Sequence, residues 1–172
     1  MMTETRAIEN PIIESEILRA RDLYDRYGRD ILADRDLGGM LARYHEAISY
    51  TRETMSVTGM VRVCAACALD GDGSCCFREV EDWYDFVLLL INLLMGTEIP
   101  LLREVPGNCL FLGKNGCSLI AKHSFCINYL CPGLKAFLGP STSVFLSTAG
   151  YELFCGWELE RSLHIWIHEN GM

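Results

Sequence analysis

Apolar residues recur at helical spacing toward both ends of the chain, and the first such stretch opens at Asn10 and Pro11. A capping side chain followed by proline suits a helix start. The apolar positions of this stretch are Ile13, Ile17, Tyr24 and Ile31. A second stretch, from about Asp36 to Ser49, has Leu37, Leu41, Tyr44 and Ile48 on one face. We therefore predict an N-terminal helical hairpin over residues 10–50.

A third helix is predicted from about Glu79 to Met95, and a last one over residues 148–170. The third contains the longest apolar run, "FVLLLINLLM" from Phe86 to Met95, which is well short of the roughly 20 residues that cross a bilayer. We expect it to be the central core element. The inward positions predicted for the last helix are Leu153, Trp157, Leu163 and Ile167.

The middle of the chain is irregular and rich in cysteine. The segment from Cys64 to Cys76 is predicted to be a loop, because glycine alternates with aspartate within it. "CLFLGKNGC", from Cys109 to Cys117, is typical of a tight hairpin. "CPGLKAFLG" after Cys131 offers one helical turn at most. The fold class is therefore mainly α, with an irregular metal-binding section over 64–132 in a single domain over 1–172.

Composition and charge narrow the function. Half of the 172 residues are apolar, which suffices for one continuous core. The net charge of −8 disfavours nucleic acid and anionic membrane surfaces as partners. The first thirty residues lack the basic start and apolar run of a secretory signal, so we expect a cytoplasmic protein.

Nine cysteines in a reducing compartment favour metal binding over a disulfide framework. Cys64 and Cys67 have the spacing that lets two sulfurs meet one centre. Cys75 and Cys76 are adjacent, and consecutive side chains in extended backbone point to opposite sides. Either they serve two centres or one of them is not a ligand. The candidate ligands are Cys64, Cys67, Cys75, Cys76, Cys109, Cys117, Cys126 and Cys131.

These cysteines resemble the pattern of the YkgJ-type cysteine-cluster proteins, which are described as zinc- or iron-chelating. "CAACALDGDGSCC" is similar to the first block, C-x2-C-x2-C-C. "CLFLGKNGC" matches the second block at its cysteines and its Phe-Leu pair, and "CINYLC" matches the third. Two departures stand out. Seven residues separate Cys67 from Cys75, where the pattern has two, and "KHSF" replaces the usual Arg-Pro ahead of the third block, in a segment one residue shorter.

The resemblance implies metal or iron–sulfur binding without a settled reaction, and a related motif in flagellin lysine methylases leaves methyl transfer open. All eight positions are cysteine and apolar residues surround them, so we favour a [4Fe-4S] cluster over zinc. The shielding residues expected are Phe77, Phe111, Leu112, Phe125 and Leu130. Two functions follow, an electron-transfer or accessory iron–sulfur protein and a structural zinc interaction module. A protein partner is expected, and the number of centres and the oligomeric state stay open.

Other candidates are weaker. His123 precedes Cys126 by three residues, and we expect at most a second-shell role for it. His164 and His168 are four residues apart on the last predicted helix, but an exposed pair near a helix C-terminus is the simpler interpretation. Cys155 is expected to be a buried thiol apart from the others, and Asn92 is expected to have a hydrogen-bond partner within the core.

Overall fold

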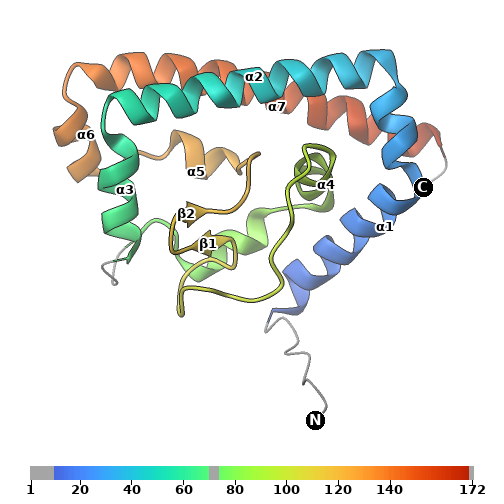
Figure 1. The fold of residues 1–172 in the computed structure, drawn as a ribbon, viewed down its shortest axis with the longest axis horizontal. Coiled ribbons are helices and arrows are strands. Elements are labelled where there is room, and N and C mark those ends of the chain that lie inside the picture. Colours follow the sequence, from blue (N-terminus) through green and yellow to red (C-terminus); the bar gives the residue numbers. More distant parts are fainter. Residues whose placement is uncertain (1–9, 70–73, 171–172) are drawn as a thin grey trace, which may run out of the picture.

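The computed structural model describes residues 10–69 and 74–170 and shows a mainly helical protein with one small hairpin (Figure 1). The long helices are α1 (Pro11–Ala33), α2 (Arg35–Val57) and α7 (Ser141–Glu169). The shorter elements are α3 (Met60–Leu69), the 3₁₀ helix η1 (Arg78–Trp83), α4 (Phe86–Leu94), β1 (Leu112–Gly113), β2 (Gly116–Cys117), α5 (Ser124–Asn128) and α6 (Pro132–Leu138). The predicted fold class is confirmed.

The frame of the molecule is an antiparallel pair of long helices, α2 and α7, with α1 folding back beneath one end (Figure 1). Asn10 caps α1 by accepting a hydrogen bond from the Ile12 amide, as the sequence predicts. Asp34 alone separates α1 from α2, and its side chain accepts from the amides of Asp36 and Leu37. The predicted N-terminal hairpin is therefore present, with a second helix that continues to Val57.

The two long helices approach closely at Gly156. A Cβ atom built there would lie 2.9 Å from Cζ of Tyr44, whose side chain is buried under α7. Only glycine leaves room for this ring at the crossing, so the sequence specifies where α7 sits on α2.

Helix α4 lies inside the frame and is buried on nearly all sides, as predicted. Asn92, the polar residue in its apolar run, donates to the carbonyl oxygens of Leu88 and Ala121 and accepts from the amides of Ile120 and Ala121. The expected hydrogen-bond partner is thus found, and Asn92 fixes the segment before α5 against the core.

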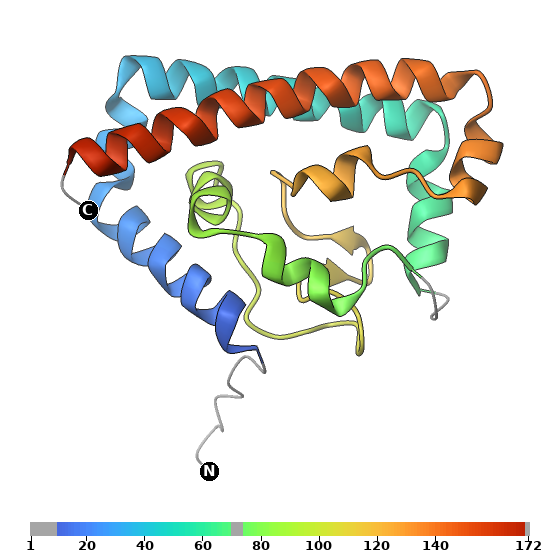
Figure 2. The same cartoon turned by 180° about the vertical axis from the view of Figure 1, so that it is seen from behind.

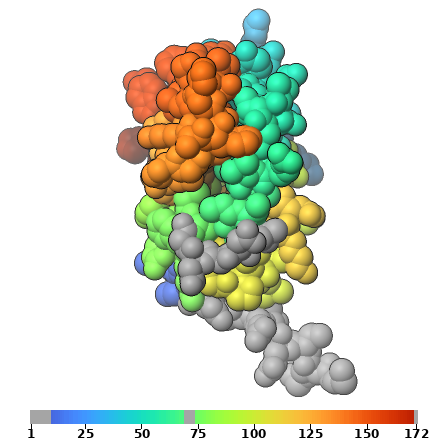
Figure 3. Space-filling view, turned by 90° about the vertical axis from the view of Figure 1, so that its left-hand side faces the viewer, coloured from blue at the N-terminus to red at the C-terminus, as the bar shows by residue number. Residues whose placement is uncertain are grey.

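A second, smaller core lies at the opposite end of the α2–α7 pair, where α3 and α6 stand side by side (Figure 3). Its buried residues are Met60, Ile127, Leu130, Leu134, Leu138, Phe145 and Ala149. Cys64 and Cys131 pack against its edge. This cluster joins α3, α5 and α6 to the start of α7 and so positions several of the cysteines.

The predicted loop from Cys64 to Cys76 is wrong in its first half. Cys64 and Cys67 lie on helix α3, where three alanines supply the helix propensity that the cysteine spacing obscured. The turn predicted over 70–73 lies outside the described residues. On a helix, positions i and i+3 share a face, so the two cysteines still face the same way.

Three other helix boundaries differ from prediction. The helix expected from Glu79 to Met95 breaks at Tyr84, because Asp85 caps a new helix by accepting from the Leu88 amide. Helix α6 has seven residues where one turn was expected, and α7 begins at Ser141 rather than at residue 148.

The inward face of α7 is also partly different from prediction. Leu163 and Ile167 are buried as expected, but Trp157 is 60% exposed. The buried stripe runs instead through Glu152, Gly156 and Leu159. Among the described residues, no helix is long and apolar enough to span a membrane.

Candidate functional site: a cluster of thiols at one end of the molecule

Eight of the nine cysteines lie on or beside the hairpin, α3, α5 and α6. Cys64 and Cys67 are on α3, and Cys75 and Cys76 lie in the segment that follows residue 73. Cys109 precedes the hairpin, Cys117 ends strand β2, Cys126 is on α5, and Cys131 caps α6. We call these eight the thiol cluster. Cys155 is buried in α7 within the main core, as expected.

Hydrogen bonds join the segments that carry the first four of these cysteines to the segment before the hairpin. The Asn108 side chain donates to the carbonyl oxygen of Ala68 on α3 over 3.1 Å. The Cys109 amide donates to the carbonyl oxygen of Cys76 over 2.9 Å, beside an antiparallel bridge between Phe77 and Asn108. Residues more than thirty positions apart are thereby held in contact.

A buried carboxylate, Glu81, anchors this arrangement. Its side chain is fully buried and accepts hydrogen bonds from both terminal nitrogens of Arg103, at 2.8 and 2.9 Å. It also accepts from the Leu110 amide and from the Asn10 side chain. Arg103 in turn donates to the carbonyl oxygen of Asn108. Glu81 therefore connects the start of α1 with the backbone next to Cys109.

These contacts also determine the charge of Glu81. Burial raises the pKa of its carboxyl group, but the hydrogen bonds from Arg103, Asn10 and the Leu110 amide outweigh burial, so the pKa lies below its usual value. Glu81 is accordingly ionised at neutral pH and forms a buried, bidentate ion pair with Arg103.

The hairpin and α5 bring in the remaining thiols. Leu112 pairs with Cys117 across the two-stranded hairpin, and the Leu112 amide donates to the carbonyl oxygen of Cys109. The hydroxyl of Tyr84 lies 3.6 Å from Sγ of Cys126 and accepts from the His123 amide. Tyr84 therefore fixes the position of α5, and with it Cys126.

His123 lies at the start of α5. Its Nδ1 accepts from the Phe125 amide over 3.2 Å, so the neutral ring carries its proton on Nε2. Burial lowers the pKa of His123, which keeps the ring neutral. Its ring contacts Trp83 and Tyr84. The capping hydrogen bond occupies Nδ1, so only Nε2 is left to donate a hydrogen bond to a metal ligand.

One group of thiols lies around Cys64. The pKa of Cys64 is raised to about 11, mainly by burial and also by the neighbouring thiols, because a second negative charge nearby disfavours ionisation. Those neighbours, in order of effect, are Cys75, Cys131 and Cys67. Sγ of Cys131 accepts from the Leu134 amide at the start of α6. We call these four residues set A.

A second group lies around Cys126. The pKa of Cys126 is raised to about 11, mainly by desolvation and also by Cys117, against a lowering by the hydrogen bond with Tyr84. Burial likewise raises the pKa of Cys109 to about 12, with Cys117 and Cys126 among its neighbours. Cys76 has Cys117 and Cys126 as neighbours too. We call Cys76, Cys109, Cys117 and Cys126 set B.

The adjacent pair joins the two sets. The thiols of Cys75 and Cys76 share a hydrogen bond, which lowers the pKa of Cys75 to about 6 and raises that of Cys76. Cys75 is a neighbour of Cys64 in set A and also of Cys126 in set B, and Cys76 has Cys117 and Cys126 as neighbours. The adjacent pair therefore lies between the two sets.

The donor chemistry fits a thiophilic metal, but the positions are not those of a closed site. Among the described residues, no three His, Cys, Asp or Glu side chains converge closely enough to hold a metal ion. With their raised pKa values, the thiols of Cys64, Cys109 and Cys126 are protonated at neutral pH. The eight thiols lie in one region, but neither set of four converges on a common metal position.

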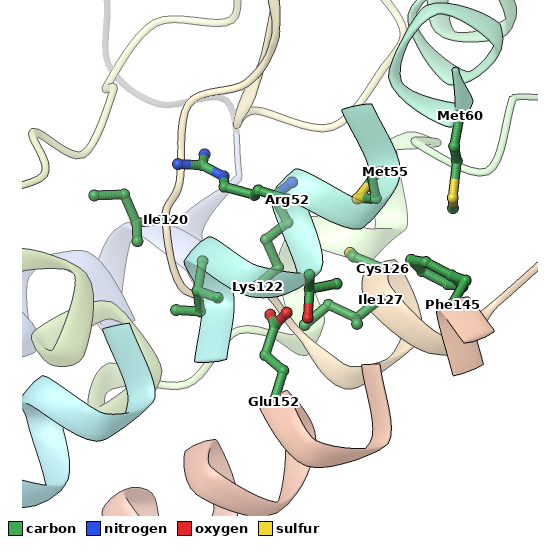
Figure 4. Close-up of a pocket in the computed structure, with 11 residues that line it drawn as sticks. Arg52, Met55, Met60, Ile120, Lys122, Cys126, Ile127, Phe145 and Glu152 are labelled. Carbon is green, nitrogen blue, oxygen red and sulfur yellow. The ribbon is translucent and has the colours of Figure 1, made fainter. Parts of the chain in front are cut away.

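A small cavity adjoins Cys126 between α2 and α7 (Figure 4). It holds about 30 Å³ and its polar lining includes Arg52, Lys122 and the buried Glu152. Burial raises the pKa of Glu152, partly offset by a hydrogen bond with Thr51 and by the two cations. A cavity of this size admits on the order of two water molecules, not an organic substrate.

Sequence reasoning missed the residues that position the thiols. These residues are Glu81, Arg103 and Tyr84, which lie outside the cysteine motifs. The sequence signal for Glu81 is weak, because it consists only of an acidic residue in a segment that also carries Val80 and Trp83. The second candidate pair, His164 and His168, is exposed, and Nε2 of His164 lies 3.7 Å from Asp85 rather than beside His168.

The fold and this region define a helical protein with a thiol-rich end. Comparison of the chain with profiles of protein families, with curated proteins and with solved structures finds no match.

Proposed function

We propose that this is a metal-binding protein whose ligands are the eight cysteines of the thiol cluster, with iron–sulfur clusters of the [4Fe-4S] type as the favoured cofactor. The observation that supports the proposal is the gathering of eight thiols from separate segments into two neighbouring sets of four. Four thiolates are what a [4Fe-4S] cluster or a structural zinc ion requires.

Under this proposal, set A holds one centre and set B holds the other. Cys75 and Cys76 are adjacent in the chain, so the two centres lie side by side. An iron–sulfur cluster, when bound, supplies one-electron transfer. The residues of this chain bind and shield it. Phe111, Leu112 and Leu130 are buried as expected, whereas Phe77 is 37% exposed. An electron-transfer protein or a cofactor-bearing accessory to a protein partner is the function that fits best.

Metal binding would draw the thiols of each set inward and release their protons. The elements that would move are short: α5 has five residues and each strand has two. Such elements are stabilised by their packing rather than by their own length, so small shifts in them cost little.

The alternative is a structural zinc module that serves protein interaction. It is favoured by the bidentate Glu81–Arg103 pair, which fixes the backbone around Cys109. An enzyme related to methyl transfer is the least favoured possibility, because the cavity that adjoins Cys126 has no room for an organic substrate. The resemblance to the YkgJ-type proteins is consistent with either metal, and a cytoplasmic location would keep the thiols reduced.

The test is to purify the protein without oxygen and to measure its visible spectrum, its metals and its acid-labile sulfide. We expect brown protein with about eight iron atoms and eight sulfides per chain if both sets are loaded. Colourless protein with stoichiometric zinc would rule out the iron–sulfur proposal in favour of the alternative. Protein that takes up neither metal would contradict both.

The matched control is Cys155→Ala, which removes the cysteine that lies in the main core apart from the cluster. The metal content should be unchanged in this variant. A loss of metal comparable to that of a cluster variant would show that the assay reports folding rather than ligation.

A further inference from the structure

The first half of α7 presents a broad uncharged face to solvent. From Ser141 to Trp157 its only charged residue is Glu152, which is buried. The outward apolar residues are each 40–60% exposed: Val144, Leu146, Tyr151, Phe154 and Trp157, joined by Tyr50 of α2. Figure 2 shows α7 in front of α2 along the molecule, with no element of the described chain in front of it. We call these six residues the α7 face.

Small residues run through this face. Ser143, Ser147 and Gly150 follow one another at i, i+4 and i+7, and a Cβ atom at Gly150 would meet nothing within 4 Å. The serines form part of an open groove of about 460 Å³ between α7 and Tyr50. Large side chains therefore project from one half of the face, and a groove lies in the other half.

We propose that the α7 face is a homodimer interface, in which the α7 helices of two copies cross antiparallel near Gly150. A two-fold axis between Gly150 and Tyr151 sets each residue opposite a partner on the other copy. Phe154 then faces the second copy's Ser147, and Trp157 faces its Val144. The large residues of each copy enter the groove of the other. Because the axis is two-fold, each of these contacts occurs twice in the dimer.

Charge does not oppose a second copy at this face. Each copy carries a net charge of −8, so two copies repel one another through most of their surface. The α7 face is uncharged, and contact through it adds no like-charge pair at the centre of the interface. An aromatic centre with few charges is also the composition typical of interface cores.

The exposed area is sufficient for a specific dimer. An aromatic residue has about 150–250 Å² of surface to bury, and the aromatic members of the face are about half exposed. The whole face then offers on the order of 600 Å² per copy, or about 1,200 Å² for two copies, which is where specific interfaces begin. The inference is independent of metal binding and stands whether or not the thiol cluster is loaded.

The test is sedimentation of the full chain under reducing conditions over a range of concentrations. Wild-type protein should dissociate reversibly, and the fluorescence of Trp157 should shift to the blue as the dimer forms. Phe154→Arg and Trp157→Arg should each raise the dissociation constant by a factor on the order of 30 or more. Leu18→Arg, at a helical residue of similar exposure on α1, should leave it unchanged.

A second variant separates lost association from misfolding. A Cβ atom at Gly150 meets nothing within 4 Å, and leucine is the better helix former, so Gly150→Leu should stabilise the monomer while obstructing the crossing. Monomeric wild-type protein at high micromolar concentration would overturn the proposal. So would a dimer that Gly150→Leu and Trp157→Arg leave intact, or a dimer that only disulfide bonds hold together.

Discussion

Gly156 is the residue at which the packing of α7 on α2 tolerates least change. In Gly156→Ala the new methyl group would meet the buried ring of Tyr44 at 2.9 Å, and the ring has no room to swing away. We expect the free energy of unfolding to fall by about 1–3 kcal/mol, as in other overpacked cores. Denaturant unfolding of the variant measures the loss.

Gly39→Ala is the matched control for this substitution. Gly39 lies in α2 and a Cβ atom there would meet nothing within 4 Å. Alanine should stabilise the protein by about 0.5–1 kcal/mol, because it is the better helix former. If both glycines gave the same change, helix propensity rather than the contact with Tyr44 would be the cause.

Glu81 makes part of the stability depend on pH. Its pKa is lower in the folded protein than in the unfolded chain, so its contribution is fully present above the unfolded value of about 4.3 and is lost as the pH falls through the folded value. Glu81→Gln should remove this acid-sensitive component. It should also cost about 3–5 kcal/mol at neutral pH, because it removes the carboxylate from a buried ion pair with Arg103.

The measurement is urea unfolding of wild-type and Glu81→Gln protein between about pH 3 and 7. Asp22→Asn, which breaks the exposed pair with Arg26, is the comparison and should have little effect, because water and salt screen exposed pairs. Parallel pH profiles for the wild type and Glu81→Gln would contradict the role given to Glu81.

At the scale of the elements, the sequence predicts those helices whose buried residues recur at helical spacing. Helices α1 and α2 and the buried α4 follow from apolar spacing, and the Asn10 cap follows from residue type. Helix α3 was missed because its cysteines were interpreted as metal-loop residues, although Ala65, Ala66 and Ala68 favour a helix.

The outward side of Trp157 was missed for a different reason. The α2–α7 crossing buries a glycine and a carboxylic acid, Gly156 and Glu152, and neither is apolar in the sequence pattern. Because Trp157 follows Leu153 by four positions, helical spacing predicts that it faces inward. Tertiary contact with Tyr44 decides the face, and a single sequence does not record that contact.

The eight cysteines that the sequence proposes as ligands lie near one another in the structure, and their role as ligands stays a prediction. Their division into two sets does not follow from the sequence. The spacing of the cysteines gives the number of candidate ligands and suggests that Cys75 and Cys76 do not share one metal. That Cys131 lies near Cys64 depends on the packing of α3 beside α6. Such contacts between distant segments follow from the whole fold rather than from any motif.

The division into sets A and B predicts the metal content of single variants. Cys64→Ser removes a ligand of set A only, and Cys117→Ser removes a ligand of set B only. Each should retain about half of the metal of the wild-type protein, since a centre needs all four thiolates. Metal and sulfide analysis checks this. Complete loss in both variants would indicate one shared centre, and no loss in either would exclude these thiols as ligands.

At the scale of the whole molecule, the two cores predict an uneven response to metal removal. The main core is built from α1, α2, α4 and α7 and includes the proposed ligands Cys109 and Cys117, whereas the smaller core holds α3, α5 and α6 with Cys64 and Cys131. Helix α4 itself carries none of the proposed ligands. Stripping the metal with a chelator should therefore expose amides in 60–69 and 124–138 to hydrogen exchange and leave those of α4 protected.

Hydrogen exchange measured by mass spectrometry before and after chelation distinguishes the outcomes. Loss of protection throughout α4 and α7 would mean that the metal holds the entire fold, as in a small zinc domain. Unchanged protection around α3 would mean that the metal is not bound there.

The order of α4 and α7 along the chain has a consequence for biosynthesis. The apolar helix α4 leaves the ribosome after α1 but well before α7, which supplies part of its cover. At about 5–20 residues per second, the gap from Leu94 to Glu169 takes roughly 4–15 s to translate. During that interval the nascent chain displays a hydrophobic helix without the part of its cover that α7 supplies, and we expect it to be a client for chaperones that bind at the ribosome.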